Sequence, residues 1–164
     1  MDKISLEREA AFKILRRSYF GAGKLEVLPK VFPRNLLDVA ALYTPGVGYL
    51  VKEILERDEA LGEITGRNNS IAVVSDGTAV LGFGSVGPRA ALPVMEGKAS
   101  MFKLLVGIDA VPICVATKNS DELLGVLKQL EPTFGGFNLE DVASQHCFSV
   151  MQRAVKELQV PIIH

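Results

Sequence analysis

Residues 70–77 read SIAVVSDG, and this stretch decides the fold. Its apolar residues run without a break from Ile71 to Val74, and the pair Asp76-Gly77 that follows favours a tight turn. A short, unbroken run rich in β-branched residues is typical of a strand that is buried on both faces of a parallel sheet. We therefore predict a buried strand over residues 70–75 that ends in a turn.

Downstream of this strand, apolar runs alternate with helical patterns to the end of the sequence. AVLGFG (79–84) is a second short apolar run, and strands are expected at 110–116, within 132–142 and at 160–163. Helices are expected at 91–105, at 120–130 with Ser120 as the N-cap, and at 144–158. Short strands that alternate with helices predict an α/β fold, here a three-layer α/β/α domain with a small, mostly parallel sheet.

Upstream of the strand the pattern is helical. Residues 4–19 predict an amphipathic helix that ends at Gly21 and Gly23, and residues 24–36 predict an extended piece and a loop. A helix is expected from Thr44, as its cap, to about Arg57. The N-terminal helical segment (1–20) has more apolar surface than a single domain needs, so we predict that it lies at the interface of a homodimer.

The composition is that of an ordinary globular domain. The 164 residues are 48% hydrophobic and 23% charged, and 18 basic against 19 acidic residues give a formal charge of −1. The absence of a basic arm or stripe argues against a nucleic-acid partner, and no apolar run approaches the roughly 18 residues of a membrane span. The N-terminus lacks an apolar signal core, and two cysteines form no disulfide framework. We expect a cytoplasmic protein.

The helix expected over residues 91–105 carries a lysine in an unusual position. On a helical wheel Lys98 falls near the centre of the apolar stripe. The apolar residues of that stripe are Val94, Met95, Met101, Phe102 and Leu105. In one interpretation the ammonium group of Lys98 reaches water or a carboxylate at the end of its long stem. In the other, desolvation disfavours the ammonium form, so that Lys98 can act as a general base, and Gly97 lets another group approach closely.

The adjacent acids Glu140 and Asp141, in FNLEDV, also have two interpretations. They are either a solvated start of the next helix, where Asp141 favours the helix N-terminus, or a pair of metal-binding carboxylates at the end of a strand. Two hard oxygen donors suit Mg²⁺ or Mn²⁺, but a third donor or the substrate must complete such a site. The two residues alone favour the first interpretation.

Two further features carry weaker signals. Gly82-x-Gly84-x-x-Gly87 matches the dinucleotide-binding fingerprint, but no acid stands at the end of the next strand, so a tight turn is the better interpretation. Tyr43 lies directly before the helix expected from Thr44; such a tyrosine is usually half-buried, but near a helix N-terminus its phenol becomes a better proton donor. His146 and His164 lack ligand spacing, and His146 is expected on a helix surface.

Four long motifs occur in one order with coherent spacing: YTPGV (43–47), SDGTAVLGFGSVGP (75–88), PVMEGKASMFK (93–103) and EPTFGGFNLEDV (131–142). Together they resemble the N-terminal half of the bacterial-type malic enzymes. VPIIH (160–164) is similar to the segment that leads into that family's second acidic motif. The resemblance covers nearly the whole chain from about residue 18, so that residues 1–164 resemble the substrate- and metal-side domain.

The resemblance implies an enzyme that oxidises L-malate with NAD or NADP and decarboxylates the resulting oxaloacetate to pyruvate, with Mg²⁺ or Mn²⁺. Lys98 matches the family's general base, which takes the C2 hydroxyl proton as hydride leaves. Tyr43 matches the acid that helps to protonate the enolate. Glu140 and Asp141 match two of the carboxylates that bind the metal, which stabilises the enolate when CO₂ departs.

The resemblance also implies what this chain lacks. The third metal carboxylate and the nicotinamide-binding domain follow the equivalent of His164, so we expect no hydride transfer by this chain alone. Asp76 stands where many relatives have asparagine. One alternative is a metal-dependent oxaloacetate decarboxylase. Another is a non-catalytic binding or oligomerisation fragment, and the presence of Tyr43, Lys98, Glu140 and Asp141 together argues against this second alternative. A nucleotide-binding domain built on residues 82–87 ranks last.

Overall fold

A computed structural model of the chain describes residues 3–164, with the side chains of residues 6–17 and 19–164. The expected N-terminal segment begins at residue 1 and includes Ile4, so residues 1–2 and the side chain of Ile4 lie outside this description. The helices and strands are α1 (Lys3–Tyr19), α2 (Leu36–Leu42), α3 (Val47–Glu56), α4 (Ala60–Ile64), the 3₁₀ turn η1 (Arg67–Asn69), β1 (Ser70–Ser75), α5 (Pro88–Val106), β2 (Asp109–Cys114), α6 (Ser120–Leu130), β3 (Phe137–Leu139), α7 (Ser144–Glu157) and β4 (Ile162–Ile163).

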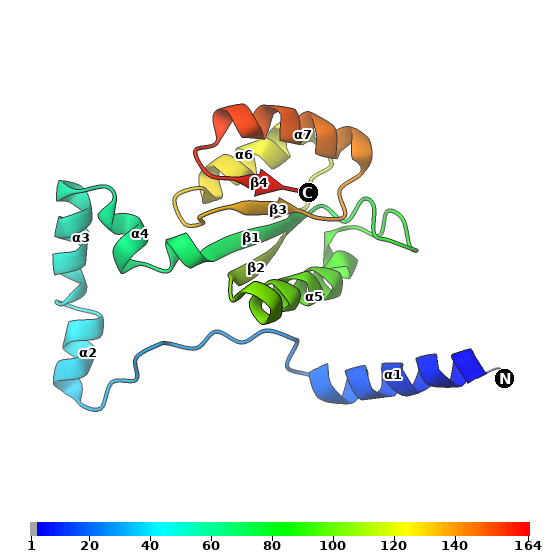
Figure 1. Ribbon diagram of the computed structural model, residues 1–164, viewed down its shortest axis with the longest axis horizontal. Helices are drawn as coiled ribbons and strands as arrows, with labels where there is room; N and C mark the ends of the chain where they lie inside the picture. The colour runs from blue at the N-terminus through cyan, green and yellow to red at the C-terminus, as the bar shows by residue number, and fades with distance from the viewer. Residues whose placement is uncertain (1–2) are drawn as a thin grey trace.

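The strands form one four-stranded parallel sheet in the order β2-β1-β3-β4 (Figure 1). β1 is central, and its Ala72 pairs with Phe137 of β3 while Ser70 pairs with Asp109 of β2. Helix α5 covers one face, and α6 and α7 cover the other, since each helix connects two parallel strands. The predicted three-layer α/β fold is confirmed.

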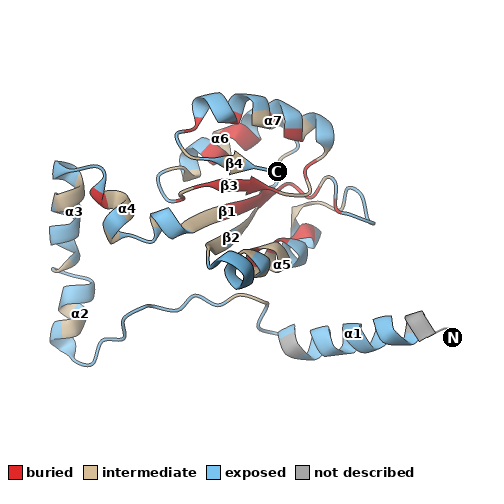
Figure 2. Ribbon diagram, in the orientation of Figure 1, coloured by how far each residue is buried: buried red, intermediate tan, exposed pale blue. Residues whose placement is uncertain are grey.

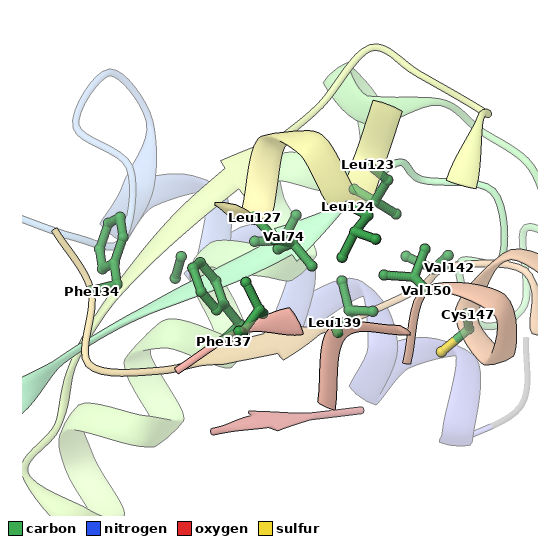
Figure 3. Packing of buried hydrophobic residues seen from close by; sticks show 13 residues of the cluster. Val74, Leu123, Leu124, Leu127, Phe134, Phe137, Leu139, Val142, Cys147 and Val150 are labelled. Atoms are coloured by element: carbon green, nitrogen blue, oxygen red, sulfur yellow. The ribbon is translucent and has the colours of Figure 1, made fainter. Parts of the chain in front are cut away.

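The larger core lies between the sheet and the helices α6 and α7 (Figure 3). Leu123, Leu124 and Leu127 of α6 meet Phe137 and Leu139 of β3, and all five are buried. Burying each such side chain contributes about 1.5–3 kcal/mol. This face of the sheet therefore supplies most of the cohesion that holds the carboxyl ends of the strands in place.

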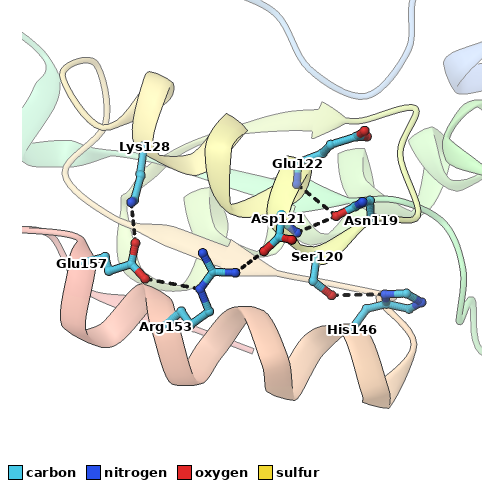
Figure 4. A network of polar contacts seen from close by, with 8 residues as sticks. All are labelled: Asn119, Ser120, Asp121, Glu122, Lys128, His146, Arg153 and Glu157. Atoms are coloured by element: carbon cyan, nitrogen blue, oxygen red, sulfur yellow. Dashed lines mark hydrogen bonds and ion pairs between the residues drawn. The ribbon is translucent and has the colours of Figure 1, made fainter.

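Polar contacts join α6 and α7 outside this core (Figure 4). Arg153 pairs with Asp121 and, at 3.3 Å, with Glu157, which in turn pairs with Lys128. The N-cap of α6 is Asn119, whose side chain accepts from the N–H groups of the first turn, so the expectation of Ser120 as the cap is wrong. Asn is as good a cap as Ser, and the cap lies one residue earlier than the pattern indicated, while the helix occupies the expected residues 120–130.

The second, smaller core lies under α5. Met95 and Ala99 are buried there against Val73 of β1, and Ala91 is buried one turn earlier. The turn after β1 needs a glycine at Gly77, which has a φ of +67°, and a Cβ there would lie 2.3 Å from the carbonyl oxygen of Gly87. The expected turn at residues 76–77 is confirmed.

The N-terminal third is extended and lies outside the α/β body (Figure 1). None of the side chains described between residues 6 and 59 is buried, and Figure 2 shows no buried residue in α2, in α3 or in the described part of α1. The main-chain N–H of Lys24 donates to Glu96 at 3.2 Å, and its ammonium group donates to the carbonyl of Pro93 at 2.8 Å, which ties this segment to α5. Among the helices of residues 3–164, none is long and apolar enough to cross a membrane.

Candidate functional site

The carboxyl ends of β1 and β3 meet at one edge of the sheet, where open α/β sheets bind their ligands. Ser75, Asp76 and Gly77 follow β1, while Glu140 and Asp141 follow β3. The N–H of Glu140 donates to the carbonyl of Val74 at 2.9 Å, so the two strands stay paired up to the edge. Glu140 and Asp141, the carboxylate pair identified from the sequence, therefore follow a strand that is paired up to its end.

Lys98 reaches this edge from α5. Its Nζ lies 2.9 Å from Oε2 of Glu140, and the two side chains are 40% and 24% exposed. A predicted base and a predicted metal ligand, 42 positions apart in the printed sequence, therefore form one ion pair. The distance is that of a charge-assisted hydrogen bond.

The expectation that Lys98 is desolvated in an apolar stripe is wrong. The buried stripe of α5 is Ala91, Met95 and Ala99, and Lys98 lies beside it, with its ammonium group on a carboxylate. Val94, Met101 and Leu105, which the wheel assigned to the core, are exposed. The wheel identifies apolar residues, but the narrow sheet covers only one side of this helix, and the small alanines are what let the helix approach it.

No group of the described chain approaches Gly97 closely. A Cβ at this position would meet no atom within 4 Å in the described part of the chain. The backbone next to Lys98 is therefore open on the side where a ligand or another chain could lie.

Asp141 has the most unusual environment at this edge. It is the one non-glycine residue of the described chain with a positive φ, +54°, and its carbonyl accepts from the N–H of Ala79 at 2.9 Å. Its Oδ2 is buried and has no hydrogen-bond partner. Burial raises the pKa of the Asp141 carboxyl, the charge of Glu140 raises it further, and Lys98 opposes both. The carboxylate of Asp141 therefore lacks a nearby positive charge sufficient to balance its burial and the charge of Glu140.

The interpretation of Asp141 as a helix-start residue does not describe its position. α7 begins at Ser144, its N-cap is Ala143 without a side-chain cap bond, and its first turn holds no acid. The side chain of Asp141 therefore contributes nothing to that helix by hydrogen bonding.

The turn after β1 fixes the loop that carries Asp141. Oδ1 of Asp76 accepts from the N–H of Thr78 at 2.9 Å and from its hydroxyl at 2.6 Å, and the same hydroxyl accepts from the N–H of Ala143 at 2.8 Å. Asp76 is buried, with 2% of the residue exposed. The sequence analysis noted Asp76 without a role and missed Thr78; the D-x-T spacing was the available signal, since an acid so placed bonds the backbone two residues on.

Asn138 is a second buried polar residue near the edge. It lies two residues before Glu140, on the face of the sheet that α5 covers, beside Val73. Its Nδ2 donates to the carbonyl of Leu139 at 3.0 Å, but its Oδ1 is buried without a partner. Sequence reasoning did not single it out.

Tyr43 is not brought to this edge by its own chain. It follows α2 directly, is 72% exposed, and lies on the α2–α3 pair, which in Figure 1 stands away from the ends toward which the arrows of β1 and β3 point. The expected helix from Thr44 begins only at Val47, with Gly46 as its N-cap and no side-chain cap bond. The two N-terminal helices are separated by a turn in which the N–H of Val47 donates to the carbonyl of Tyr43.

The remaining signals find ordinary explanations. Residues 79–84 are not a strand: a turn closes through the single pairing of Val80 with Gly84, in agreement with a tight turn rather than a phosphate loop. His146 is half-buried, not on the helix surface, with its Nδ1 3.2 Å from the hydroxyl of Ser120. Burial and the nearby charge of Asp76 raise the pKa of the Cys147 thiol, which disfavours the reactive thiolate.

The carboxylates fit a divalent cation in part. Oxygen donors suit Mg²⁺ or Mn²⁺, and the unpartnered oxygen of Asp141 beside Glu140 is the donor such an ion needs. Within residues 3–164, no group of three or more His, Cys, Asp and Glu side chains is placed to hold a metal. Glu140 and Asp141 can therefore supply two ligands, and the substrate or another chain segment must supply the others.

Comparison with known proteins identifies the family. The family profile described as "Malic enzyme, N-terminal domain" matches residues 22–155. The "Bifunctional malic/malolactic enzyme" of Bacillus subtilis is 49% identical over 142 residues, 87% of this chain and 35% of the relative. The "NAD-dependent malic enzyme" of Geobacillus stearothermophilus is 45% identical over the same share of this chain and 30% of its own length.

The fold agrees with a solved structure. The malic enzyme of Pyrococcus horikoshii matches with a TM-score of 0.90 at 43% identity, over 96% of this chain and 36% of that one. The chain thus spans about a third of the length of the relatives it matches. Since the family profile covers well over half of it, this chain belongs to the malic enzyme family and comprises its N-terminal domain.

Proposed function

We propose that this chain is the malate- and metal-binding part of an enzyme that converts L-malate to pyruvate and CO₂ with NAD or NADP. The observation that carries the proposal is the ion pair of Lys98 with Glu140 at the carboxyl edge of the sheet, next to a carboxylate oxygen of Asp141 that has no partner. A base and two oxygen ligands within reach of one small hydroxy acid are what this reaction needs. The names of the relatives support the substrate.

In the proposed reaction Lys98, as the free amine, accepts the proton of the C2 hydroxyl of malate. Its 2.9 Å contact with Glu140 keeps the side-chain nitrogen of Lys98 beside the residues that would hold the metal. Glu140 and Asp141 would hold Mg²⁺ or Mn²⁺. When bound, this ion supplies Lewis-acid polarisation of the substrate oxygen. The open space beside Gly97 leaves room for the substrate.

The hydride passes to NAD or NADP. Residues 82–87 belong to a tight turn, and we do not assign the cofactor to them. After loss of CO₂ a proton must be returned to carbon, and we assign this step to Tyr43. Its exposed phenol is free to meet a substrate. We also propose that the chain forms a homodimer through the N-terminal segment, whose apolar side chains are uncovered.

A metal-dependent decarboxylation of oxaloacetate without hydride transfer would use the same Glu140, Asp141 and Tyr43. A non-catalytic module would need none of them. The unpartnered oxygen of Asp141 argues for a site over a scaffold, since a buried unsatisfied acceptor costs about 1–3 kcal/mol.

The proposal is tested by titrating the chain with Mn²⁺ and following free Mn²⁺ by electron paramagnetic resonance. Asp141→Asn should weaken binding at least about tenfold, which is the loss of about 1.4 kcal/mol expected for one charged ligand. The exposed Asp58→Asn is the matched control and should bind as the wild type does. Equal affinity in all three proteins would contradict the proposal.

Catalysis is tested in a chimera in which this chain replaces the matching third of the Bacillus subtilis relative. Malate-dependent reduction of NAD or NADP should appear in the chimera and disappear with Lys98→Met. A folded chimera with Lys98→Met that keeps its activity would remove Lys98 from the mechanism. Loss of CO₂ from oxaloacetate without malate oxidation would favour the decarboxylase alternative.

A further inference from the structure

We propose that Asn138 is a positioning residue for Lys98: its side-chain oxygen accepts a hydrogen bond from the Lys98 nitrogen when a metal ion takes Glu140. This inference rests on the metal site and on the role of Lys98 proposed above. It assigns a task to a buried amide that the proposed reaction does not otherwise use, and it gives Lys98 two positions.

Asn138 is buried in the middle of β3 with an acceptor that has no donor. All three residues of β3 are buried (Figure 2), and Asn138 is 1% exposed. Its Nδ2 donates to the carbonyl of Leu139 at 3.0 Å, and because a carbonyl oxygen needs a donor, this contact fixes which end of the amide is the nitrogen. Oδ1 is therefore the buried atom without a partner. Burying an acceptor without a donor is costly, so its presence needs a reason.

The side chains of Asn138 and Glu140 share the face of the sheet that α5 covers. Asn138 pairs with Val73 of β1, and Val73 packs under α5. Glu140 follows two positions later, and its N–H still donates to the carbonyl of Val74, so the alternation of side chains along the strand continues. The two positions are therefore roughly 7 Å apart along the chain, on one face.

Lys98 approaches this face from α5. It is three positions after Met95, the α5 residue that packs on Val73. Its nitrogen lies 2.9 Å from Oε2 of Glu140, at the end of a flexible four-carbon stem. Since the side chain of Lys98 is 40% exposed, its stem has room to rotate from one acceptor to the other without a movement of the helix.

Metal binding gives Lys98 a need for a second acceptor. Glu140 is one of the two carboxylates proposed to hold the ion, and a divalent cation repels an ammonium group that shares its ligand. As the free amine of the proposed reaction, Lys98 has two N–H groups and one lone pair. An acceptor for one N–H fixes the direction of the lone pair that receives the C2 hydroxyl proton. Oδ1 of Asn138 supplies this acceptor without adding a charge.

Other donors do not account for the free oxygen of Asn138. Ser75 is buried on the same face, but its hydroxyl oxygen accepts from the N–H of Gly77 at 3.0 Å and makes no bond to Asn138. A buried water needs two or more polar partners, whereas Val73 and Ile163, which flank Asn138 on the neighbouring strands, are apolar. Lys98 is therefore the donor that we assign.

A cycle of four proteins tests the inference by titration with Mn²⁺, followed by electron paramagnetic resonance. The proteins are the wild type, Asn138→Leu, Lys98→Met and the double variant. Leucine resembles asparagine in shape but offers no acceptor, and methionine keeps the unbranched side chain of lysine without its charge. The assay needs neither malate nor a nicotinamide cofactor, so it reads binding of the metal alone.

Asn138→Leu should weaken Mn²⁺ binding at least about fivefold when Lys98 is present, because Lys98 then stays on Glu140; this is the lower end of typical coupling between two groups. In the Lys98→Met background the same substitution should change the affinity less than about twofold, as for independent sites. Lys98→Met alone should bind Mn²⁺ at least as tightly as the wild type. Equal weakening in both backgrounds would show a structural role, a bound water or direct ligation by Asn138, and would overturn the inference. Wild-type affinity in Asn138→Leu would overturn it as well.

A measurement without metal separates this inference from the proposed function. In a Glu140→Ala chain Lys98 has lost its carboxylate and should rest on Asn138. Adding Lys98→Met should then lower the Tm by about 2 °C or more, and by clearly less when Asn138→Leu is also present. Equal losses of Tm would overturn the inference, whereas a wild type that binds no Mn²⁺ would contradict the proposed metal site and leave this measurement to decide on Asn138. Asn138→Val is a second variant in case leucine disturbs the fold, and circular dichroism verifies each protein.

Discussion

Asp141→Asn should stabilise the chain at neutral pH while it weakens metal binding. The carboxylate of Asp141 is partly buried, has one oxygen without a partner, and lies beside the charge of Glu140. Asparagine has nearly the same shape, removes the charge, and is among the residues that best tolerate the φ of +54° at this position. The substitution therefore keeps the backbone and removes the electrostatic cost.

The expected gain is about 1 kcal/mol at pH 7.5, since an unsatisfied buried acceptor costs about 1–3 kcal/mol and an amide relieves only part of that. For a domain of this size this corresponds to a rise in Tm of roughly 2–4 °C. Glu140→Gln is the matched control. It loses the partly exposed pair with Lys98, worth about 0–1 kcal/mol, and also removes the repulsion between Glu140 and Asp141, so its stability should stay within about 1 kcal/mol of wild type.

The effect has a defined pH dependence. Because the pKa of Asp141 is raised in the folded state, the folded protein binds more protons than the unfolded one between the ordinary value of 3.8 and the raised value. The wild type therefore gains stability as the pH falls through that window, and the advantage of Asp141→Asn shrinks there and is absent below pH 3.8.

The measurement is thermal unfolding of wild type and both variants from pH 8 to pH 4, with and without Mn²⁺. Mn²⁺ should raise the Tm of the wild type by mass action and raise that of Asp141→Asn much less. A Tm for Asp141→Asn that is 2 °C or more below wild type at pH 7.5, or an advantage that is constant down to pH 4, would refute this account of the site.

Three further predictions concern the same edge of the sheet. Lys98→Met should leave the unfolding free energy within about 1 kcal/mol of wild type by chemical denaturation, because a partly exposed ion pair contributes little; a loss above about 2 kcal/mol would make Lys98 a structural residue. Thr78→Val should lower the free energy of unfolding by about 1–3 kcal/mol and weaken Mn²⁺ binding, since it removes the hydrogen bonds to Asp76 and Ala143. Thr78→Ser keeps the hydroxyl and should retain both stability and binding. Equal Mn²⁺ affinity in the two variants would show that Thr78 does not support the metal site. The 164-residue chain, given malate, Mn²⁺ and NAD or NADP, should reduce no cofactor in an absorbance assay, and turnover without an added chain would contradict this.

The α/β body was predictable because its strands are short, unbroken apolar runs. β1 occupies the predicted residues 70–75, and the helices after it lie within three residues of their expected bounds. α2 was missed: the loop expected over residues 24–36 includes only its first residue, and no element was assigned to residues 37–42. A signal was present: Asn35 accepts from the N–H of Asp38, and Asp38 accepts from the N–H of Arg34, which is a reciprocal cap.

The candidate site was only partly predictable from local pattern. Motifs identified Lys98, Glu140 and Asp141, but the wheel misplaced Lys98, because helical periodicity does not reveal how much of a helix the sheet covers. The positive φ of Asp141 and the bond from Ala143 to Thr78 depend on chain segments 65 positions apart. A short stretch of sequence does not contain such contacts. The sequence therefore predicted which residue types form the site, but not how the fold positions them.

The buried polar atoms without hydrogen-bond partners are not spread evenly over the two faces of the sheet. The α6–α7 face is packed with buried leucine, phenylalanine and valine side chains and carries the stability of the domain. Two buried side-chain oxygens without partners, in Asn138 and Asp141, belong to β3 and to the loop after it. A fold under selection for stability alone would replace both with groups that need no partner. A cation bound at the proposed site would reduce the cost at Asp141, so Mn²⁺ should stabilise the wild-type chain more than a variant that lacks this carboxylate.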